Sequence, residues 1–219
     1  MRIALIGMSG SGKSFWSSIL SRHGFHKLGC DNAIGRRLVD GGELSEGSLD
    51  HIGRWMGFPF ETGFSRREAL YLDHEKAVMD QFLTELETRP ADDASPVVID
   101  TTGSVIYTGR VIHQRLRQQT VVVYLSTSAA FRQKLHRTYA ANPRPVLWQQ
   151  HFQKKTGEDN PSALKRCYKN LIADRDARYR QYAHLEILWD PTPDRTQEVD
   201  TLIAPVTSFL EQRRSSHGA

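Results

Sequence analysis

The segment from Gly7 to Ser14 constrains the fold of this chain more than any other feature of its sequence. It reads Gly-Met-Ser-Gly-Ser-Gly-Lys-Ser, a complete G-x-x-x-x-G-K-[ST] motif. The apolar run Ile3–Ile6 precedes the motif, and a helical pattern of apolar residues begins at Phe15. Because such a motif binds phosphate between a strand and a helix, this context predicts a strand–loop–helix unit.

The motif also predicts a ligand. Glycines allow successive backbone N–H groups to turn inward around phosphate oxygens, at the positive end of the following helix. Lys13 would reach the β- and γ-phosphates, and Ser14 would ligate Mg²⁺. We therefore expect ATP and Mg²⁺ as cofactors. The expected nucleotide contacts within the motif are Gly7, Gly10, Ser11, Gly12, Lys13 and Ser14.

Length and composition predict one globular domain. The chain has 219 residues, of which 39% are hydrophobic and 25% charged, and this is within the single-domain range. No run of eighteen apolar residues occurs, so we expect neither a membrane span nor a secretory signal, and a cytoplasmic location. Cys30 and Cys167 have no metal or redox spacing and are expected as free thiols. The domain should cover residues 1–212, followed by a disordered tail over 213–219.

Apolar runs alternate with helical patterns along the whole chain, which predicts a parallel sheet covered by helices on both faces. The expected strands are 3–6, 25–29, 97–99, 120–125 and 185–188; the expected helices are 32–39, 48–56, 67–87, 109–118, 129–139, 162–182 and 194–211. Ligands of such sheets bind at the carboxyl ends of the strands. Ser14, Asp31 and Asp100 follow the first three strands and are candidate site residues.

Two aspartates have both a functional and a structural interpretation. Asp100 ends the apolar run Val97–Ile99, an arrangement that holds Mg²⁺ beside the loop serine, although an aspartate there also caps turns. Asp31 is an alternative metal partner and a natural group to accept a proton from an acceptor hydroxyl. Its structural alternative is a cap of the helix expected at Asn32.

Positive charge is concentrated in one segment. Residues 132–180 contain twelve lysines and arginines against four aspartates and glutamates, so this segment carries +8 and the remainder of the chain −4. Such a segment suits anionic ligands, whether nucleotide phosphates, a carboxylate or a nucleic acid. A solvated helix face is the structural alternative.

Several further motifs together resemble the shikimate kinase family of P-loop kinases. These are Cys30-Asp31-Asn32-Ala33-Ile34, Thr101-Thr102-Gly103-Ser104-Val105, Val121–Leu125, Arg137–Leu147 with its Arg-Pro-Val-Leu ending, and Arg175-Asp176-Ala177-Arg178-Tyr179. The resemblance covers most of the chain. It implies a three-layer α/β/α P-loop kinase fold with a five-stranded parallel sheet and a mobile lid over about 137–160.

The resemblance also implies roles for individual residues. Arg137, in the lid, would contact the nucleotide and act in catalysis with Lys13. Arg144 and Arg175 would grip an acceptor carboxylate, for which a planar guanidinium is suited. Asp31 would hydrogen-bond the acceptor hydroxyl and act as its base. Gly103 would allow close approach of the backbone to the acceptor.

The sequence departs from the family pattern on the acceptor side. Gly29 replaces the first aspartate of an Asp-x-Asp pair, and Thr101 and Thr102 replace two glycines. Leu72 stands where the family has a third carboxylate-binding arginine, which Arg66 or Arg67 could replace. Two insertions, 58–67 and 148–160, have no counterpart.

These features predict a phosphotransferase that moves the γ-phosphate of ATP to a hydroxyl of a small carboxylate-bearing substrate. One alternative acceptor is a nucleoside or polynucleotide 5′-hydroxyl, which the Asp31–Arg36 pair and the basic segment would suit. Another alternative is a nucleotide-binding regulator whose hydrolysis of the nucleotide drives a switch.

Overall fold

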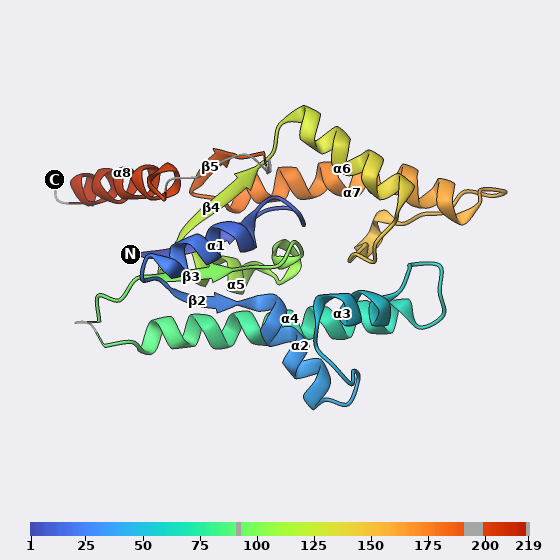
Figure 1. The fold of residues 1–219 in the computed structure, drawn as a ribbon, viewed down its shortest axis with the longest axis horizontal. Helices are drawn as coiled ribbons and strands as arrows, with labels where there is room; N and C mark the ends of the chain where they lie inside the picture. Colours follow the sequence, from blue (N-terminus) through green and yellow to red (C-terminus); the bar gives the residue numbers. More distant parts are fainter. Residues whose placement is uncertain (91–92, 191–198, 218–219) are drawn as a thin grey trace.

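The protein is described from a computed structural model, which covers residues 1–90, 93–190 and 199–217. Five parallel strands form one sheet in the order β2-β3-β1-β4-β5 (Figure 1). The strands are β1 (Arg2–Ile6), β2 (His26–Gly29), β3 (Val97–Asp100), β4 (Val121–Ser126) and β5 (Leu185–Leu188). The predicted five-stranded parallel sheet is therefore confirmed.

The helices lie close to the predicted segments, and side-chain caps explain several of their starts. Ser128 Oγ accepts from Phe131 N at the start of α6, and Asp159 accepts from Ser162 N at the start of α7, which satisfies backbone donors left open at a helix start. The α-helices are α1 (Lys13–Arg22), α2 (Cys30–Asp40), α3 (Leu49–Met56), α4 (Phe64–Thr88), α5 (Arg110–Gln119), α6 (Ala129–Ala141), α7 (Asn160–Tyr182) and α8 (Asp200–His217); short 3-10 turns are η1 (Val105–Tyr107) and η2 (Gln149–His151).

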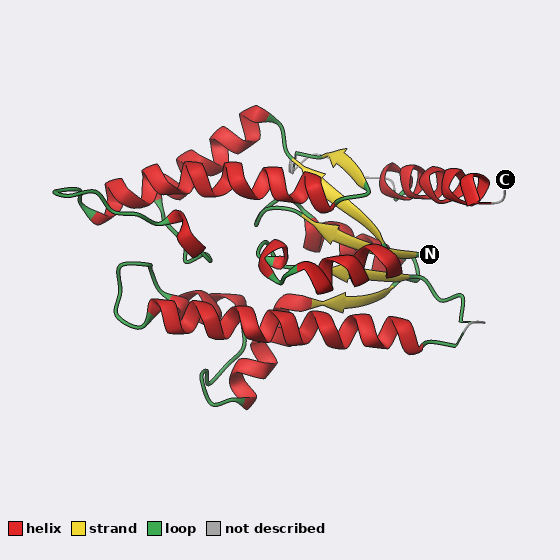
Figure 2. Cartoon of the chain, turned by 180° about the vertical axis from the view of Figure 1, so that it is seen from behind, coloured by secondary structure: helices red, strands yellow, loops and turns green. Residues whose placement is uncertain are grey.

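Alternate residues of each strand build two cores, one on each face of the sheet. Ile3 and Leu5 pack with residues of α1 and α8, whereas Ala4 and Ile6 pack with residues of α2, α4, α5 and α7. All four side chains are buried, as expected for central strands of a parallel sheet. The three layers follow from this division, and Figure 2 shows the sheet between its helices from the opposite side.

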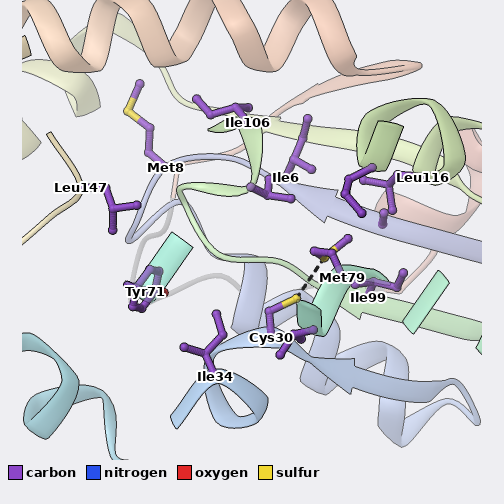
Figure 3. Packing of buried hydrophobic residues seen from close by; sticks show 14 of the residues in the cluster. Ile6, Met8, Cys30, Ile34, Tyr71, Met79, Ile99, Ile106, Leu116 and Leu147 are labelled. Atoms are coloured by element: carbon purple, nitrogen blue, oxygen red, sulfur yellow. Dashed lines mark hydrogen bonds between the residues drawn. The ribbon is translucent and has the colours of Figure 1, made fainter. Parts of the chain in front are cut away.

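The larger core extends to the carboxyl ends of the strands. Figure 3 shows Met8 after β1, Tyr71 of α4 and Leu147 of the lid as members of this one cluster. Cys30 lies in the same cluster, with its sulfur 3.4 Å from that of Met79. Both cysteines are free thiols, as predicted, and both are buried. The core thus joins three segments that the candidate site also uses.

Two long projections leave the sheet at the end where the strands terminate (Figure 1). One consists of α6 and α7, which lie side by side and are connected by residues 142–159 with η2. The rings of Tyr139 and Tyr168 stack between these helices at 3.7 Å, and Trp148 is buried against them. The other projection consists of α3, the start of α4 and the connection between them.

Some predicted boundaries are wrong. Residues 213–217 were expected in a disordered tail but continue helix α8 to His217, while 218–219 lie outside the described residues. The last helix was expected from Asp194 and begins at Asp200, and 191–198 also lie outside the described residues. Within the described part of the chain, no helix is long and apolar enough to span a membrane.

Candidate active site

The phosphate loop, Gly7–Ser14, connects β1 to α1 at the carboxyl end of the sheet. Its glycines Gly7, Gly10 and Gly12 have φ of 148°, 80° and 95°, a region that favours glycine. A Cβ at Gly12 would lie 2.5 Å from Trp189 Nε1. Only glycine fits at Gly12, because both its φ and the neighbouring indole exclude a side chain.

Lys13 begins α1 and folds back over the loop. Its Nζ donates to Gly7 O and Met8 O, both at 2.9 Å. Burial lowers the pKa of Lys13, while the nearby Asp31 and Asp100 raise it in part. The ammonium is therefore held inside the loop by carbonyl groups that phosphate oxygens can replace.

Asp100 ends β3 beside the phosphate loop. Its Oδ2 accepts from Ser17 Oγ at 2.9 Å and lies 3.3 Å from Lys27 Nζ. Its Oδ1 is buried and has no hydrogen-bond partner. Ser14, one turn before Ser17, is exposed. An unpartnered carboxylate oxygen and a hydroxyl are hard oxygen ligands, and Mg²⁺ in kinases uses few protein ligands besides phosphates and waters. These residues fit Mg²⁺, although no group of three His, Cys, Asp or Glu gathers anywhere in the described ranges.

Asp31 lies in the first turn of α2. The helix begins at Cys30 after Gly29, and no side chain caps it. Asp31 therefore does not cap this helix, which was the structural alternative for its role. Burial raises the pKa of the Asp31 carboxyl; Lys13 opposes this rise and Asp100 adds to it. Asp31 is thus close enough to Lys13 and Asp100 for their charges to shift its pKa.

Gly103 brings the acceptor loop, Thr101–Ser104, against the phosphate loop. A Cβ at Gly103 would lie 3.3 Å from Ser9 N and 3.5 Å from Arg175 Nη1. Tyr179 Oη donates to Gly103 O at 2.5 Å. The absence of a side chain at Gly103 therefore allows three elements to meet: the phosphate loop, the acceptor loop and α7.

Arg175 of α7 is buried where the phosphate loop, the acceptor loop and α7 meet. It is 6% exposed, its Nη2 donates to Leu147 O at 2.7 Å, and its guanidinium lies over the ring of Tyr107. Its Nε is buried without a hydrogen-bond partner. A buried charged donor without an acceptor is costly, and an anionic group bound here would satisfy it.

A buried carboxylate, Glu75 of α4, was missed by the sequence analysis as a site residue. It is 0% exposed and accepts from the hydroxyls of Thr102 and Ser104, the latter at 2.6 Å. Burial raises the pKa of Glu75 to about 7, although these two hydrogen bonds lower it. Thr101 Oγ1 donates to Leu5 O at 2.6 Å. Both threonine hydroxyls therefore bond inward and hold the acceptor loop in place.

The lid arginines stand apart from this cluster. Arg137 and Arg144 are exposed, and neither has a partner in the described part of the chain. Arg66 pairs with Glu43 at 2.6 Å, and Arg67 lies 3.6 Å from Glu61. Both candidate replacements for the missing arginine at position 72 thus bind local carboxylates, and Arg175 is the arginine that the structure brings to the phosphate loop.

Three arginines of the basic segment form ion pairs with carboxylates within the fold. Arg166 pairs with Glu158, Arg178 with Asp174, and Arg180 with both Asp176 and Glu186. These pairs lie on α7 and its immediate neighbours. Glu158, Asp174 and Asp176 are already counted in the +8, and only Glu186 lies outside the segment, so the segment stays strongly positive.

Comparison with known proteins rests on structure. No protein family model matches the chain, and no curated protein matches its sequence significantly. A shikimate kinase from Acinetobacter baumannii, solved in complex with shikimate, superposes with a TM-score of 0.55 at 22% identity over 98% of this chain and 93% of its own. The chain has a shikimate kinase-like P-loop kinase fold.

Two further structures have the same fold. The shikimate kinase from Bacteroides thetaiotaomicron gives a TM-score of 0.60 at 17% identity, covering 96% of this chain and 98% of that one. The shikimate kinase from Aquifex aeolicus gives 0.53 at 16% identity, covering 98% of each chain. At these identities the likeness concerns the fold, and the acceptor must be argued from the site itself.

Proposed function

We propose that this chain is an ATP-dependent phosphotransferase that moves the γ-phosphate to a hydroxyl of a small carboxylate-bearing substrate. The observation that carries the proposal is the position of Arg175. Its Nη1 lies against Gly103, which itself lies against Ser9 N of the phosphate loop. A carboxylate bound by Arg175 would hold the rest of a small molecule within reach of a phosphate on the loop.

The nucleotide half of the proposal rests on the phosphate loop. Triphosphate oxygens replace the carbonyls of Gly7 and Met8 as partners of the Lys13 ammonium, and Lys13 then neutralises charge that develops during transfer. Ser14 and Asp100 would hold Mg²⁺, which neutralises phosphate charge when bound. Gly10, Ser11 and Gly12 supply backbone donors.

The acceptor half rests on Asp31. A carboxyl whose pKa is raised by burial is better matched to proton transfer near neutral pH than an exposed one. Asp31 accepts the proton of the acceptor hydroxyl while the oxygen of that hydroxyl forms a bond to the γ-phosphorus. The bond from that phosphorus to the bridging oxygen breaks, and ADP leaves.

The lid completes the site by closing. Arg137 and Arg144 are exposed on the lid, 137–160, so closure is needed to bring them to the ligands. Lid closure excludes water and completes a catalytic site in many enzymes. In the closed form Arg137 contacts the nucleotide, and Arg144 joins Arg175 on the acceptor carboxylate.

A nucleoside or polynucleotide acceptor is favoured by one observation. A surface cavity of about 340 Å³ follows α2 beyond Asp31 and is lined by Asn32, Arg36, Val39, Asp40 and Gly47. Arg36 could bind a phosphate of a longer acceptor there. On α7, Arg166, Arg178 and Arg180 are engaged by carboxylates, so a nucleic-acid backbone would have to be bound by the other cations of the segment.

The test is an acceptor screen that measures ADP formation with shikimate, gluconate, free nucleosides and 5′-hydroxyl oligonucleotides in parallel. A response to a carboxylate-bearing alcohol, lost in Lys13→Ala, supports the proposal. A response only to oligonucleotides, steeply reduced by salt, would replace it with the polynucleotide function. ADP formation without any acceptor would favour the regulatory NTPase.

A further inference from the structure

Lys27 of β2 contacts the candidate metal ligand Asp100, and nothing in the proposed transfer uses it. Its Nζ lies 3.3 Å from Asp100 Oδ2 and 3.4 Å from Ser18 Oγ. The side chain of Lys27 is 28% exposed and that of Asp100 is 9% exposed. The pair is therefore partly shielded from solvent, where a charge interaction is stronger than on an open surface.

Lys27 lies beside Gly29, which has no side chain. Gly29 is the neighbour of Asp100 in the β2–β3 register, whereas Lys27 is paired with Val98. A Cβ built at Gly29 would have Lys27 Cε at 3.9 Å and Asn32 Nδ2 at 4.0 Å as its nearest neighbours. Lys27 and Gly29 point to the same side of the strand, so the lysine reaches across the glycine to the carboxylate.

The two oxygens of Asp100 have different environments. Oδ2 has two partners, Ser17 Oγ and Lys27 Nζ, while Oδ1 is buried without one. Lys27 thus neutralises the charge of the carboxylate through Oδ2 and leaves Oδ1 without a partner. Around the phosphate loop, Lys13 and Lys27 together balance Asp31 and Asp100.

We propose that Lys27 is a built-in counter-ion of Asp100 that reduces the dependence of nucleotide binding on the divalent cation. This inference rests on the proposed binding of ATP with Mg²⁺. The ammonium weakens the attraction of Asp100 for a cation, and it also lowers the repulsion between Asp100 and metal-free phosphates. Both effects bring the affinities with and without metal closer together.

The experiment measures ADP binding by titration calorimetry, once with Mg²⁺ and once with EDTA. The quantity compared is the dissociation constant with EDTA divided by the dissociation constant with Mg²⁺. In Lys27→Met this ratio should rise on the order of tenfold, because removing one unit charge near a partly buried carboxylate changes binding by about that factor. Lys27→Arg should keep the wild-type ratio.

Two further variants sharpen the test. Lys76→Met removes an exposed lysine that pairs with Asp73 on α4 and should leave the ratio unchanged. Gly29→Asp fits the extended backbone at φ −102° and offers Lys27 a second carboxylate, so the ratio should rise although Lys27 is present. Thermal unfolding of each variant checks the fold.

The outcomes separate this inference from the proposed function. If wild-type protein binds ADP in a metal-dependent way but Lys27→Met gives the same ratio, Lys27 is an ordinary surface ion pair and the inference is wrong. If the ratio falls, Lys27 assists metal binding and the sign is wrong. If wild-type protein binds no nucleotide, the proposed function fails, and the inference fails with it.

Discussion

The phosphate loop and the lid differ in how the charged side chains of the candidate site are placed: those at the loop already contact or lie near one another, whereas those on the lid stand apart from them. At the phosphate loop, Lys13 is held by two carbonyls and lies near Asp31 and Asp100. On the lid, Arg137 and Arg144 are exposed. Residues at strand ends are positioned by the sheet, whereas residues on a helical projection depend on movement of that projection. Nucleotide recognition should therefore tolerate lid changes better than acceptor recognition does.

The two insertions contact each other across the acceptor side. Phe60 of the first lies 6.4 Å, ring to ring, from Phe152 of the second. Glu68, just after the first insertion, accepts from the backbone N–H groups of Trp148 and Gln149, the latter at 3.0 Å. The two segments that the sequence analysis interpreted as insertions thus lie where α4 meets the lid, and the lid is less separate from α4 than its exposed arginines indicate.

The largest expected effect is at Lys13. Lys13→Ala should leave the fold intact and reduce phosphoryl transfer by a factor of about 10²–10⁵, because the ammonium stabilises charge that develops on the phosphates. Steady-state ADP formation measures this, with Lys76→Ala as a matched exposed-lysine control. Turnover within a fewfold of wild type in a folded Lys13→Ala protein would break the proposed role of the phosphate loop.

Asp31 and Asp100 should separate the two halves of the site. Asp100→Asn should raise the Mg²⁺ concentration needed for half-maximal rate. Asp31→Asn should lower acceptor turnover by a factor of about 10²–10⁴, typical of a lost general base, with little change in ATP affinity. Paired titrations of Mg²⁺ and of acceptor measure both effects. The reverse pattern would exchange the two assignments.

The residues of the site whose positions could be predicted from the sequence are those at the ends of strands, because the sheet positions them. Asp100 is paired in register with Leu5, two residues before the loop, so an apolar run ending in aspartate was enough to bring it near Ser14. The glycine motif carries its own conformation. Local spacing and strand register together were therefore sufficient for the fold and for the position of Asp100 beside the phosphate loop.

The remaining contacts depend on helix rotation and on side-chain reach, which spacing does not reveal. Glu75 meets Thr102 from α4, 27 positions away in sequence, and only the packing of that helix decides which side faces the acceptor loop. Lys27 is paired with Val98 in the register and reaches Asp100 by the length of its side chain. The pairing of Arg66 with Glu43 also required the fold of the α2–α3 connection.

Glu75 predicts a pH-dependent stability. Burial raises its pKa from an ordinary value of 4.5 to about 7 in the folded protein, so between these values the folded state binds more protons than the unfolded state. The free energy of unfolding should therefore fall as pH rises from about 4.5 to 7, by roughly 3 kcal/mol from this residue. Urea unfolding at pH 5, 6, 7 and 8 measures the slope.

Glu75→Gln is the matched variant, because it keeps the shape of the side chain and cannot ionise. Its unfolding free energy should depend less on pH, and the variant should gain stability relative to wild type as pH rises. The pKa of Asp31 is also raised by burial, so a weaker slope in the same direction should remain. Parallel curves for the two proteins would mean that Glu75 ionises normally in the folded protein.

The two carboxylate-binding arginines test the acceptor side directly. Arg175→Lys should raise the acceptor KM on the order of tenfold, because lysine keeps the charge and loses the planar two-donor edge. Arg144→Lys should have a smaller effect, since Arg144 is exposed before closure. The KM of ATP should change little in either variant. An unchanged acceptor KM in Arg175→Lys would exclude a carboxylate at this position.

The smallest expected effect concerns the contact between the insertions. Phe60 is 41% exposed, so its pairing with Phe152 should contribute only about 0.5 kcal/mol of coupling to stability. A double-mutant cycle of Phe60→Ala and Phe152→Ala, followed by urea unfolding, measures this coupling. If the contact also holds the lid near α4, both single variants should raise the acceptor KM slightly and leave nucleotide affinity unchanged. If the variants change nucleotide affinity as much as the acceptor KM, the contact does not act on the acceptor specifically. The difference between the phosphate loop and the lid would then not depend on the insertions.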